Sequence, residues 1–242
     1  MMRIFTLLLT MALVACSTSK DGDFTMFSIE EDLAFGKELA QSIQSDPVNY
    51  PLLSRAEAPR EYAKLDRILE KILSSQHILH RNELAWELHI IQNDTIQNAF
   101  CAPGGFIYVY TGLMKFVESE DELAGIIAHE VAHGDLRHST DQLTKQYGIQ
   151  VIIALLTDSD SQLLADIGAS LVQLGYSRSD EAEADRFAVR YLKDTPYNPV
   201  AFANFFSRMQ AKDGNMGIFQ FLSTHPDPGN RVEKIHEEAR MN

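Results

Sequence analysis

Cysteine is scarce in this chain: Cys16 and Cys101 are the only two among 242 residues. If Cys16 is consumed by a modification, as its surroundings indicate below, Cys101 has no partner for a disulfide bond. The fold must then rely on its hydrophobic core and on any metal that it binds. We do not expect Cys101 to be a nucleophile, because the sequence shows no base for it and a buried cysteine usually behaves as a small apolar residue.

Positive charge is scarce as well. The chain has 21 Lys and Arg against 34 Asp and Glu, which gives a net charge of −13 and a pI of about 5.0. A nucleic-acid-binding protein usually presents a basic face, and attraction to anionic lipid headgroups needs a cluster of basic residues. The composition therefore argues against nucleic acid as a partner and against membrane binding through a basic patch.

Long apolar runs are missing beyond the N-terminus. The apolar stretches at 149–156 and 163–174 are shorter than the roughly 20 residues that a membrane-spanning helix needs, so we interpret them as helices of the core or of a substrate groove. The chain shows no internal repeat. Its hydrophobic content of 45% and charged content of 23% are ordinary for a globular protein, and residues 28–242 suffice for a single domain.

The first residues resemble a targeting segment. Arg3 is followed by an apolar run at 4–14 that is too short for a permanent membrane anchor. The sequence Leu-Val-Ala-Cys at 13–16 resembles the bacterial lipobox, which implies cleavage before Cys16 and a lipid on its sulfur. We therefore expect a signal peptide at 1–15, a lipidated tether at 16–27 and a location in the bacterial cell envelope. Ser17 favours the outer membrane, facing the periplasm; the alternative is a plain secretory peptide with an incidental cysteine.

The most informative pattern is His-Glu-Val-Ala-His at residues 129–133. Its two histidines are four residues apart, so on a helix they project from one face and can bind one metal ion. Glu130 can then act on a water molecule held by that metal. Ser119 and Glu122 form a capping box, which predicts a helix of about five turns that begins near Glu120. The pattern is typical of zinc proteases, and from it we predict a zinc-dependent endopeptidase.

A catalytic zinc site needs a third protein ligand. Glu181 and Asp185 are four residues apart on a second predicted helix. We assign Glu181 to the zinc, beside His129 and His133. Asp185 is expected to accept a hydrogen bond from the free ring nitrogen of a ligating histidine and so to fix its tautomer. Taken alone, the two carboxylates could also be solvated acids on a surface helix.

The remaining patterns predict an α+β fold that is mostly helical with a small sheet. Capping signals and helical periodicity predict helices, and alternating aromatic and β-branched residues predict strands. His89 is expected to face outward from its strand. We predict helices at 29–43, 61–73, 198–209 and 230–239, strands at 84–91 and 106–111, and an irregular connection at 46–59.

Several of these motifs together resemble one family. The histidine motif followed by Arg137 and His138, the Glu-Ala-Glu-Ala-Asp segment at 181–185, the segment 98–113 and His225 with Arg231 occur in its order. The chain resembles the gluzincin metallopeptidases that include the CAAX prenyl endopeptidases and bacterial periplasmic quality-control proteases. The resemblance covers about residues 28–240 and implies a zincin-like domain, here in a lipoprotein without helical repeats. Cys101 departs from the small apolar residue that the family leads us to expect.

The segment 98–113 is similar to the edge-strand region of that family. An edge strand has unpaired backbone groups, to which an extended polypeptide can add as a further strand. Gly104 would let it approach closely. Such a site favours unfolded or misfolded polypeptides, which supply a free strand. We therefore expect substrate along Gly105, Phe106, Ile107, Tyr108, Val109 and Tyr110.

The resemblance also implies roles in the reaction. Glu130 would be the general base that takes a proton from the zinc-held water. His225 would be a second donor to the oxyanion or a removable fourth zinc ligand; otherwise it is a loop histidine beside Pro226. Arg231 is expected to pair with a site carboxylate, unless it is a solvated surface residue.

Two other functions remain possible from the sequence. A zinc-stabilised, non-proteolytic chaperone or assembly lipoprotein would use the same groove without turnover, although Glu130 would then have no purpose. A structural metal module would keep four permanent ligands and no exchangeable water. We expect the other histidines to be structural or on the surface, with His138 close to a helix C-terminus.

Overall fold

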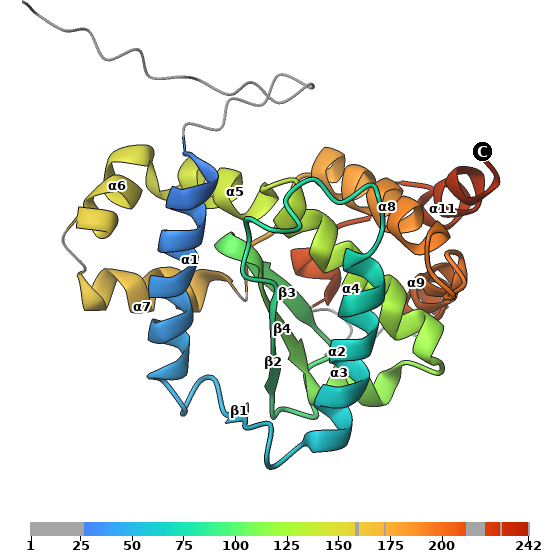
Figure 1. Cartoon of the computed structure of the whole chain (residues 1–242), viewed down its shortest axis with the longest axis horizontal. Coiled ribbons are helices and arrows are strands. Elements are labelled where there is room, and N and C mark those ends of the chain that lie inside the picture. Colours follow the sequence, from blue (N-terminus) through green and yellow to red (C-terminus); the bar gives the residue numbers. More distant parts are fainter. Residues whose placement is uncertain (1–26, 158–159, 172, 212–220, 228, 242) are drawn as a thin grey trace, which may run out of the picture.

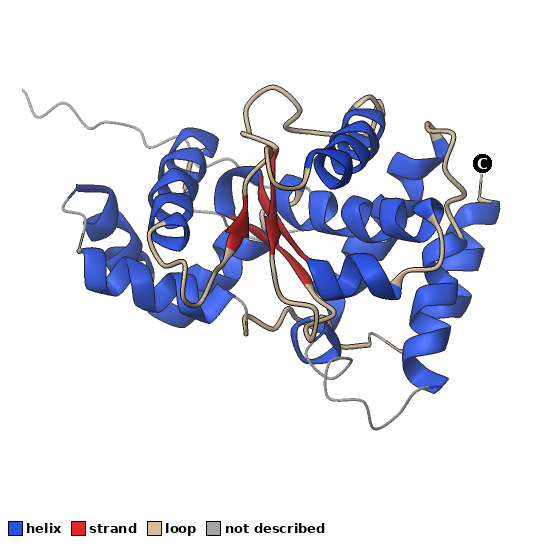
Figure 2. Cartoon of the chain, turned by 90° about the horizontal axis from the view of Figure 1, so that it is seen from below, coloured by secondary structure: helices blue, strands red, loops and turns tan. Residues whose placement is uncertain are grey.

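The computed structural model describes residues 27–157, 160–171, 173–211, 221–227 and 229–241. A four-stranded sheet lies between two groups of helices, as Figure 2 shows. The predicted signal segment and Cys16 lie outside the described residues. The elements are α1 (Ile29–Gln44), β1 (Leu52–Leu53), α2 (Pro59–Leu73), β2 (Glu87–Ile91), β3 (Ala99–Ala102), β4 (Phe106–Tyr110), α3 (Thr111–Phe116), α4 (Glu120–Asp135), α5 (His138–Tyr147), α6 (Ile149–Thr157), α7 (Ser161–Leu171), α8 (Arg178–Lys193), α9 (Ala201–Ala211) and α11 (Arg231–Arg240).

The sheet has the strand order β1-β2-β4-β3. Strand β4 runs parallel to β2 and antiparallel to β3, so both of its sides are paired. The prediction that 106–110 is an edge strand is therefore wrong, and the edge strands among those described are β1 and β3. The reason is local. A 3-10 turn at Pro103–Gly105 reverses the chain, so β3 pairs with one side of β4 and leaves that side unavailable to another strand.

The two glycines of that turn serve the fold rather than a substrate. Gly104 has φ 76° and Gly105 has φ 84°, a left-handed conformation that favours glycine. A Cβ on Gly104 would lie 3.1 Å from the backbone oxygen of Asp32, and one on Gly105 would lie 3.1 Å from the backbone nitrogen of Trp86. The close approach expected for a polypeptide substrate is thus made by α1 and by the segment before β2.

Strand β4 divides two hydrophobic cores. Ile107 and Val109 face a core built with α2, α4, α8, α9 and α11. Phe106, Tyr108 and Tyr110 face a second core, built with α1, α6 and α7, which lie together on the left in Figure 1. All five side chains are buried. Successive residues of a strand point to opposite faces, so the alternation places β4 at the centre of the domain.

Three helices begin with a serine whose side chain caps the helix N-terminus. At α1 the predicted capping box is present, with reciprocal bonds between Ser28 and Glu31. At α4 the Ser119 hydroxyl accepts from the Glu122 N–H as predicted, but the Glu122 carboxylate accepts from the Glu118 N–H instead of closing the box. A third box, which we did not predict, begins α8 at Ser177.

Most predicted elements are present with shifted ends. Trp86 has φ 49°, which is uncommon for a residue with a side chain, and β2 begins only after it. At 198–200 a turn, in which the Asn198 side chain accepts from the Val200 N–H, precedes α9. His89 is only partly exposed, because its ring stacks on Tyr108. Strand β1 and helices α3 and α5 were not predicted. None of the described helices is long and apolar enough to cross a membrane.

Candidate metal centre

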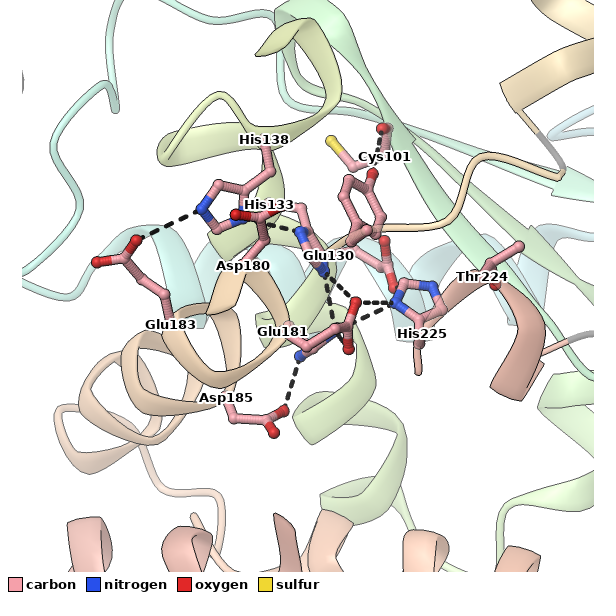
Figure 3. A network of polar contacts seen from close by, with 12 residues as sticks. Cys101, Glu130, His133, His138, Asp180, Glu181, Glu183, Asp185, Thr224 and His225 are labelled. Atoms are coloured by element: carbon pink, nitrogen blue, oxygen red, sulfur yellow. Dashed lines mark hydrogen bonds and ion pairs between the residues drawn. The ribbon is translucent and has the colours of Figure 1, made fainter. Parts of the chain in front are cut away.

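Helices α4 and α8 pack side by side and bring the predicted ligands together (Figures 1 and 3). The Nε2 atoms of His129 and His133 lie 3.0 Å apart. The Glu181 carboxylate reaches them from α8, with Oε2 3.4 Å from His129 Nε2 and Oε1 3.3 Å from His133 Nε2. All three residues are buried. The structure therefore brings these three side chains together.

His225 completes the cluster from the segment that follows Phe221. Its Nδ1 lies 3.0 Å from Glu181 Oε1 and 3.3 Å from His129 Nε2. The Phe221 ring stacks on it with centroids 4.5 Å apart. His225 is fully buried. It is not a surface loop histidine, and its Nδ1 belongs to the same group of donor atoms.

The spacing of these atoms fits one small cation. Four ligands at the usual zinc distances of about 2.0–2.1 Å occupy the corners of a tetrahedron with edges of about 3.3 Å. The contacts described above, 3.0–3.4 Å, are close to this length, and one donor atom from each of the four residues lies within 4.8 Å of the others. Imidazole and carboxylate are ordinary zinc ligands, and these four could hold one metal ion. Without a cation, such a concentration of buried acceptors would be costly.

Asp185 and Arg231 lie around the donor group. Asp185 Oδ1 lies 3.0 Å from Nδ1 of His129, the nitrogen that points away from the other donors. The Arg231 guanidinium donates to both Asp185 oxygens, at 2.7 and 2.9 Å, and to Glu181 Oε2 at 2.5 Å. Its side chain is 1% exposed. It is therefore a buried cation that links the two carboxylates of α8.

Glu130 is buried beside the cluster but is not bonded to it. Within the described residues neither of its carboxylate oxygens has a hydrogen-bond partner. Its Oε1 lies 3.5 Å from His225 Nε2. Burial raises the pKa of the Glu130 carboxyl, and the charges of His225 and His129 oppose that rise. An unpaired buried carboxylate is rare in proteins, and its place beside a metal-binding group suits proton transfer.

The charges of the site oppose the effect of burial on its other groups. Burial alone would favour neutral forms. Even so, His225, Arg231 and His129 hold the pKa of Glu181 well below its usual range. Burial also works against charge on His129, yet Glu181 and Asp185 raise its pKa to about 9. Glu181 is thus kept as the carboxylate that a metal ion requires.

Tyr176, His138 and Glu183 support His133 directly or through one another, a role that we did not predict for them. Tyr176 stacks on the His133 ring with centroids 3.8 Å apart. His138 Nδ1 lies 2.9 Å from His133 Nδ1, and Glu183 Oε2 lies 3.6 Å from His138 Nε2. His138 is buried at the start of α5, and it lies close to the C-terminus of α4, whose C-cap is Leu136, as predicted. The sequence signals that could have indicated this support were the Arg137-His138 pair after the histidine motif and the position of Glu183 within the motif at 181–185.

The outer edge of β3 faces the cluster. The Cys101 carbonyl accepts from the Ser139 hydroxyl, which is also 2.9 Å from the Tyr176 hydroxyl. The Ala99 carbonyl lies 3.4 Å from His225 Nε2. Side chains around the metal-binding group therefore occupy the carbonyls that an added strand would use. The Cys101 side chain is itself buried, and burial raises the pKa of its thiol.

A helical domain with a small mixed sheet, in which two histidines of one buried helix and a glutamate of its neighbour converge, is a zincin-like metallopeptidase domain. The chain belongs to peptidase family M48, whose model matches residues 59–239. This agrees with the family resemblance drawn from the motifs.

Curated proteins with similar sequences carry two kinds of name. The chain is 33% identical to mitochondrial metalloendopeptidase OMA1 of Schizosaccharomyces pombe over 180 residues, which are 72% of this chain and 51% of the relative. It is 26% identical to the putative beta-barrel assembly-enhancing protease of Vibrio cholerae over 235 residues, 88% of this chain and 45% of that protein. The protein named beta-barrel assembly-enhancing protease in Escherichia coli is 26% identical over 186 residues, 70% of this chain and 38% of its own length. The chain spans about half the length of these relatives, or less.

Proposed function

We propose that this chain is a zinc-dependent metalloendopeptidase that cleaves unfolded or misfolded proteins of the cell envelope. The observation that carries the proposal is the donor group of His129, His133 and Glu181, next to a Glu130 carboxylate that has no hydrogen-bond partner among the described residues. A structural metal site would have no use for that carboxylate. The non-proteolytic chaperone considered above gives Glu130 no role either.

The residues divide the work as follows. His129, His133 and Glu181 would hold zinc, which would supply a Lewis acid able to polarise a peptide carbonyl and to make a water molecule more acidic. Glu130 acts as the general base and returns the proton to the leaving amine. Asp185 fixes the His129 ring through its Nδ1. The low-dielectric surroundings strengthen each of these charge interactions.

Arg231 contributes to the same assembly as a positioning residue. Its guanidinium bonds Glu181 and Asp185 together, so the orientation of the metal-binding carboxylate depends on it. Bidentate pairing between guanidinium and carboxylate restricts direction as well as distance. Its placement therefore supports a role in holding Glu181 toward the two histidines.

His225 is proposed as a removable fourth ligand in a resting form. Its Nδ1 lies at donor distance from Glu181 and His129, whereas its Nε2 faces Glu130 and the Ala99 carbonyl. If His225 withdrew, a water molecule could take its place beside the other three donors. In the alternative role, the His225 Nε2 that faces Glu130 would donate to the oxyanion.

The substrate is proposed to bind as an extended chain along β3, not along β4 as expected from the sequence. β3 is one of the two edge strands, and its Ala99 and Cys101 carbonyls face the donor group. A polypeptide that adds to this edge would replace the His225 and Ser139 side chains at these carbonyls with backbone N–H groups. Since only an unfolded segment can supply such a strand, the geometry favours unfolded or misfolded substrates.

The location is proposed from the N-terminal sequence and the bacterial relatives. The segment at 13–16 resembles a lipobox, which would anchor the chain through lipid on Cys16 in the outer membrane, facing the periplasm. The relatives named beta-barrel assembly-enhancing protease support an envelope location. The charge of −13 remains an argument against nucleic acid as a partner.

The decisive experiment pairs metal analysis with turnover. The purified protein should contain one zinc per chain and degrade unfolded casein, and phenanthroline should stop the degradation. Glu130→Gln should abolish cleavage while zinc and polypeptide binding persist, because the amide cannot take the proton. Asp121→Asn, a partly exposed change in the first turn of the same helix, is a matched control. Cleavage that continued in chelator, or in the Glu130→Gln protein, would exclude the mechanism.

A further inference from the structure

His138 lies against the far side of a proposed metal ligand. Its Nδ1 is 2.9 Å from Nδ1 of His133, whose other nitrogen belongs to the donor group. Figure 3 shows the two rings in line with Glu183, whose carboxylate lies 3.6 Å from His138 Nε2. A carboxylate and two imidazoles therefore form a chain that ends at the metal-binding group.

A helix break makes this contact possible. On a continuous helix, residues five positions apart are rotated by about 140° around the axis, so His138 could not return to His133. Instead α4 ends at Asp135, and Arg137 has φ 64° before α5 begins. Such a left-handed conformation is uncommon for a residue with a side chain. The Arg137 guanidinium donates to Asp32 Oδ2 at 2.6 Å, which fastens the corner to α1.

The tautomers of this chain follow from the donor group. A neutral imidazole carries one proton, on one of its two nitrogens. If Nε2 of His133 binds a metal, its proton is on Nδ1 and is donated to Nδ1 of His138. His138 then carries its own proton on Nε2, toward Glu183. Each member therefore has a single arrangement compatible with its neighbours.

The two metal-binding histidines are thus supported differently. His129 faces the Asp185 carboxylate directly. His133 faces a second imidazole, and its ring is also held flat against Tyr176. Ser139, the residue after His138 on α5, lies 2.9 Å from the Tyr176 hydroxyl. The first turn of α5 therefore holds the His133 ring in two ways: His138 contacts its Nδ1, and Ser139 contacts the tyrosine that stacks on its face.

We propose that His138 is a positioning residue that accepts the Nδ1 proton of His133 and so holds that ligand in the tautomer and orientation that bind the metal, with Glu183 as the terminal acceptor. This inference rests on the proposed zinc site. Hydrogen-bond partners of this kind typically change metal affinity by about 10–100-fold when they are removed.

The first test measures zinc affinity by competition with a chromophoric chelator. His138→Leu removes the acceptor and should weaken binding by about 10–100-fold. His138→Asn keeps an acceptor oxygen near the position of Nδ1 and should recover most of that loss. His89→Leu is the matched control, because His89 also stacks on a tyrosine but lies in another part of the fold. Equal affinity in His138→Leu and His89→Leu would overturn the proposal, as would a failure of Asn to restore binding.

The second test does not depend on the folding of a buried variant. Glu183 is 26% exposed at its side chain and also pairs with Arg186. Glu183→Gln should weaken zinc binding, but by less than His138→Leu does. Arg186→Gln, which breaks the ion pair between Arg186 and Glu183, should leave zinc binding unchanged. Nitrogen NMR of the zinc-bound protein should show a slowly exchanging proton on Nδ1 of His133. A proton-free Nδ1 would contradict the inference.

Failure of this inference can be distinguished from failure of the proposed function. If the parent protein binds no zinc, the metal site itself is wrong. If the parent binds zinc and His138→Leu binds it equally well, the metal site stands and only the role of His138 is refuted.

Discussion

Arg231 offers the sharpest test of how the site is held together. It is a buried guanidinium bonded to two carboxylates, and its plane lies over the Phe206 ring at 3.9 Å from the centroid. Arg231→Met keeps the length and most of the apolar contact but removes the charge. Removal of one partner from a buried ion pair typically costs about 3–5 kcal/mol, because the remaining charge stays buried without compensation.

That cost translates into a measurable melting temperature. For a domain of this size, 1 kcal/mol shifts Tm by about 2–4 °C, so the metal-free Arg231→Met protein should melt roughly 6–20 °C lower than the metal-free parent. Bound zinc should reduce the difference, because it is a second positive charge beside Glu181. The assay is thermal unfolding followed by circular dichroism, with excess chelator and then with zinc.

A matched variant separates the buried pair from an ordinary one. Arg190, on α8, pairs with Glu238 on α11 at 2.7 Å but is 38% exposed at its side chain. A surface pair of this kind contributes about 0–1 kcal/mol, so Arg190→Met should lower Tm by less than about 4 °C. The reasoning is refuted if the two variants melt together, or if zinc leaves the Arg231→Met difference unchanged.

Three further predictions can be tested with single variants, the first two from contacts in the structure and the third from the N-terminal sequence. Gly134→Ala should destabilise the protein by about 1–3 kcal/mol in urea unfolding, because its Cβ would lie 2.9 Å from the Cys101 sulfur, and adding Cys101→Ala should recover part of the loss. Burial raises the pKa of Glu122, but the hydrogen bonds and charge of Arg208 lower it by more, so the pKa is lower in the folded protein than in the unfolded chain. The stability that this pair contributes should therefore be fully present above the unfolded pKa, near pH 4.3, and should be lost as the pH falls through the folded pKa. Arg208→Met should remove that part of the pH dependence of stability. If Cys16 carries lipid, Cys16→Ser should move the protein from the membrane to the soluble fraction, and unchanged sedimentation with membranes would count against the anchor.

The helices and the metal-binding group were predictable because their signals are local. The interval between His129 and His133 matches a helical turn, and Ser28, Ser119 and Ser177 cap the helices that follow them. Each of these relations joins residues three or four positions apart in the sequence. Helix type and the shared face of the ligands could therefore be inferred without knowledge of the rest of the fold.

The order of the strands was not predictable in the same way. The buried alternation of 106–110 is equally consistent with an edge strand that is covered by helices and with an internal strand. What decides the matter is the pairing of β4 with both β2 and β3, which are separate segments of the chain. No periodicity within β4 carries that information.

The support of His133 was missed for a related reason. A five-residue interval to His138 matches no face of a regular helix, so the pair carries no helical signal. The contact depends on the left-handed conformation of Arg137, which in turn is held by Asp32 more than a hundred positions earlier. A residue that forces a corner is visible in a sequence mainly when it is glycine or proline, and here it is an arginine.

The engaged carbonyls of β3 have a consequence for the behaviour of the protein in a crowded compartment. An open strand edge is a template on which identical molecules can stack and eventually form fibrils. Here the hydroxyl of Ser139 and the ring of His225 already occupy the Cys101 and Ala99 oxygens. A second copy of this protein, like the substrate that is proposed to bind there, would have to displace both contacts before its backbone could pair with this edge.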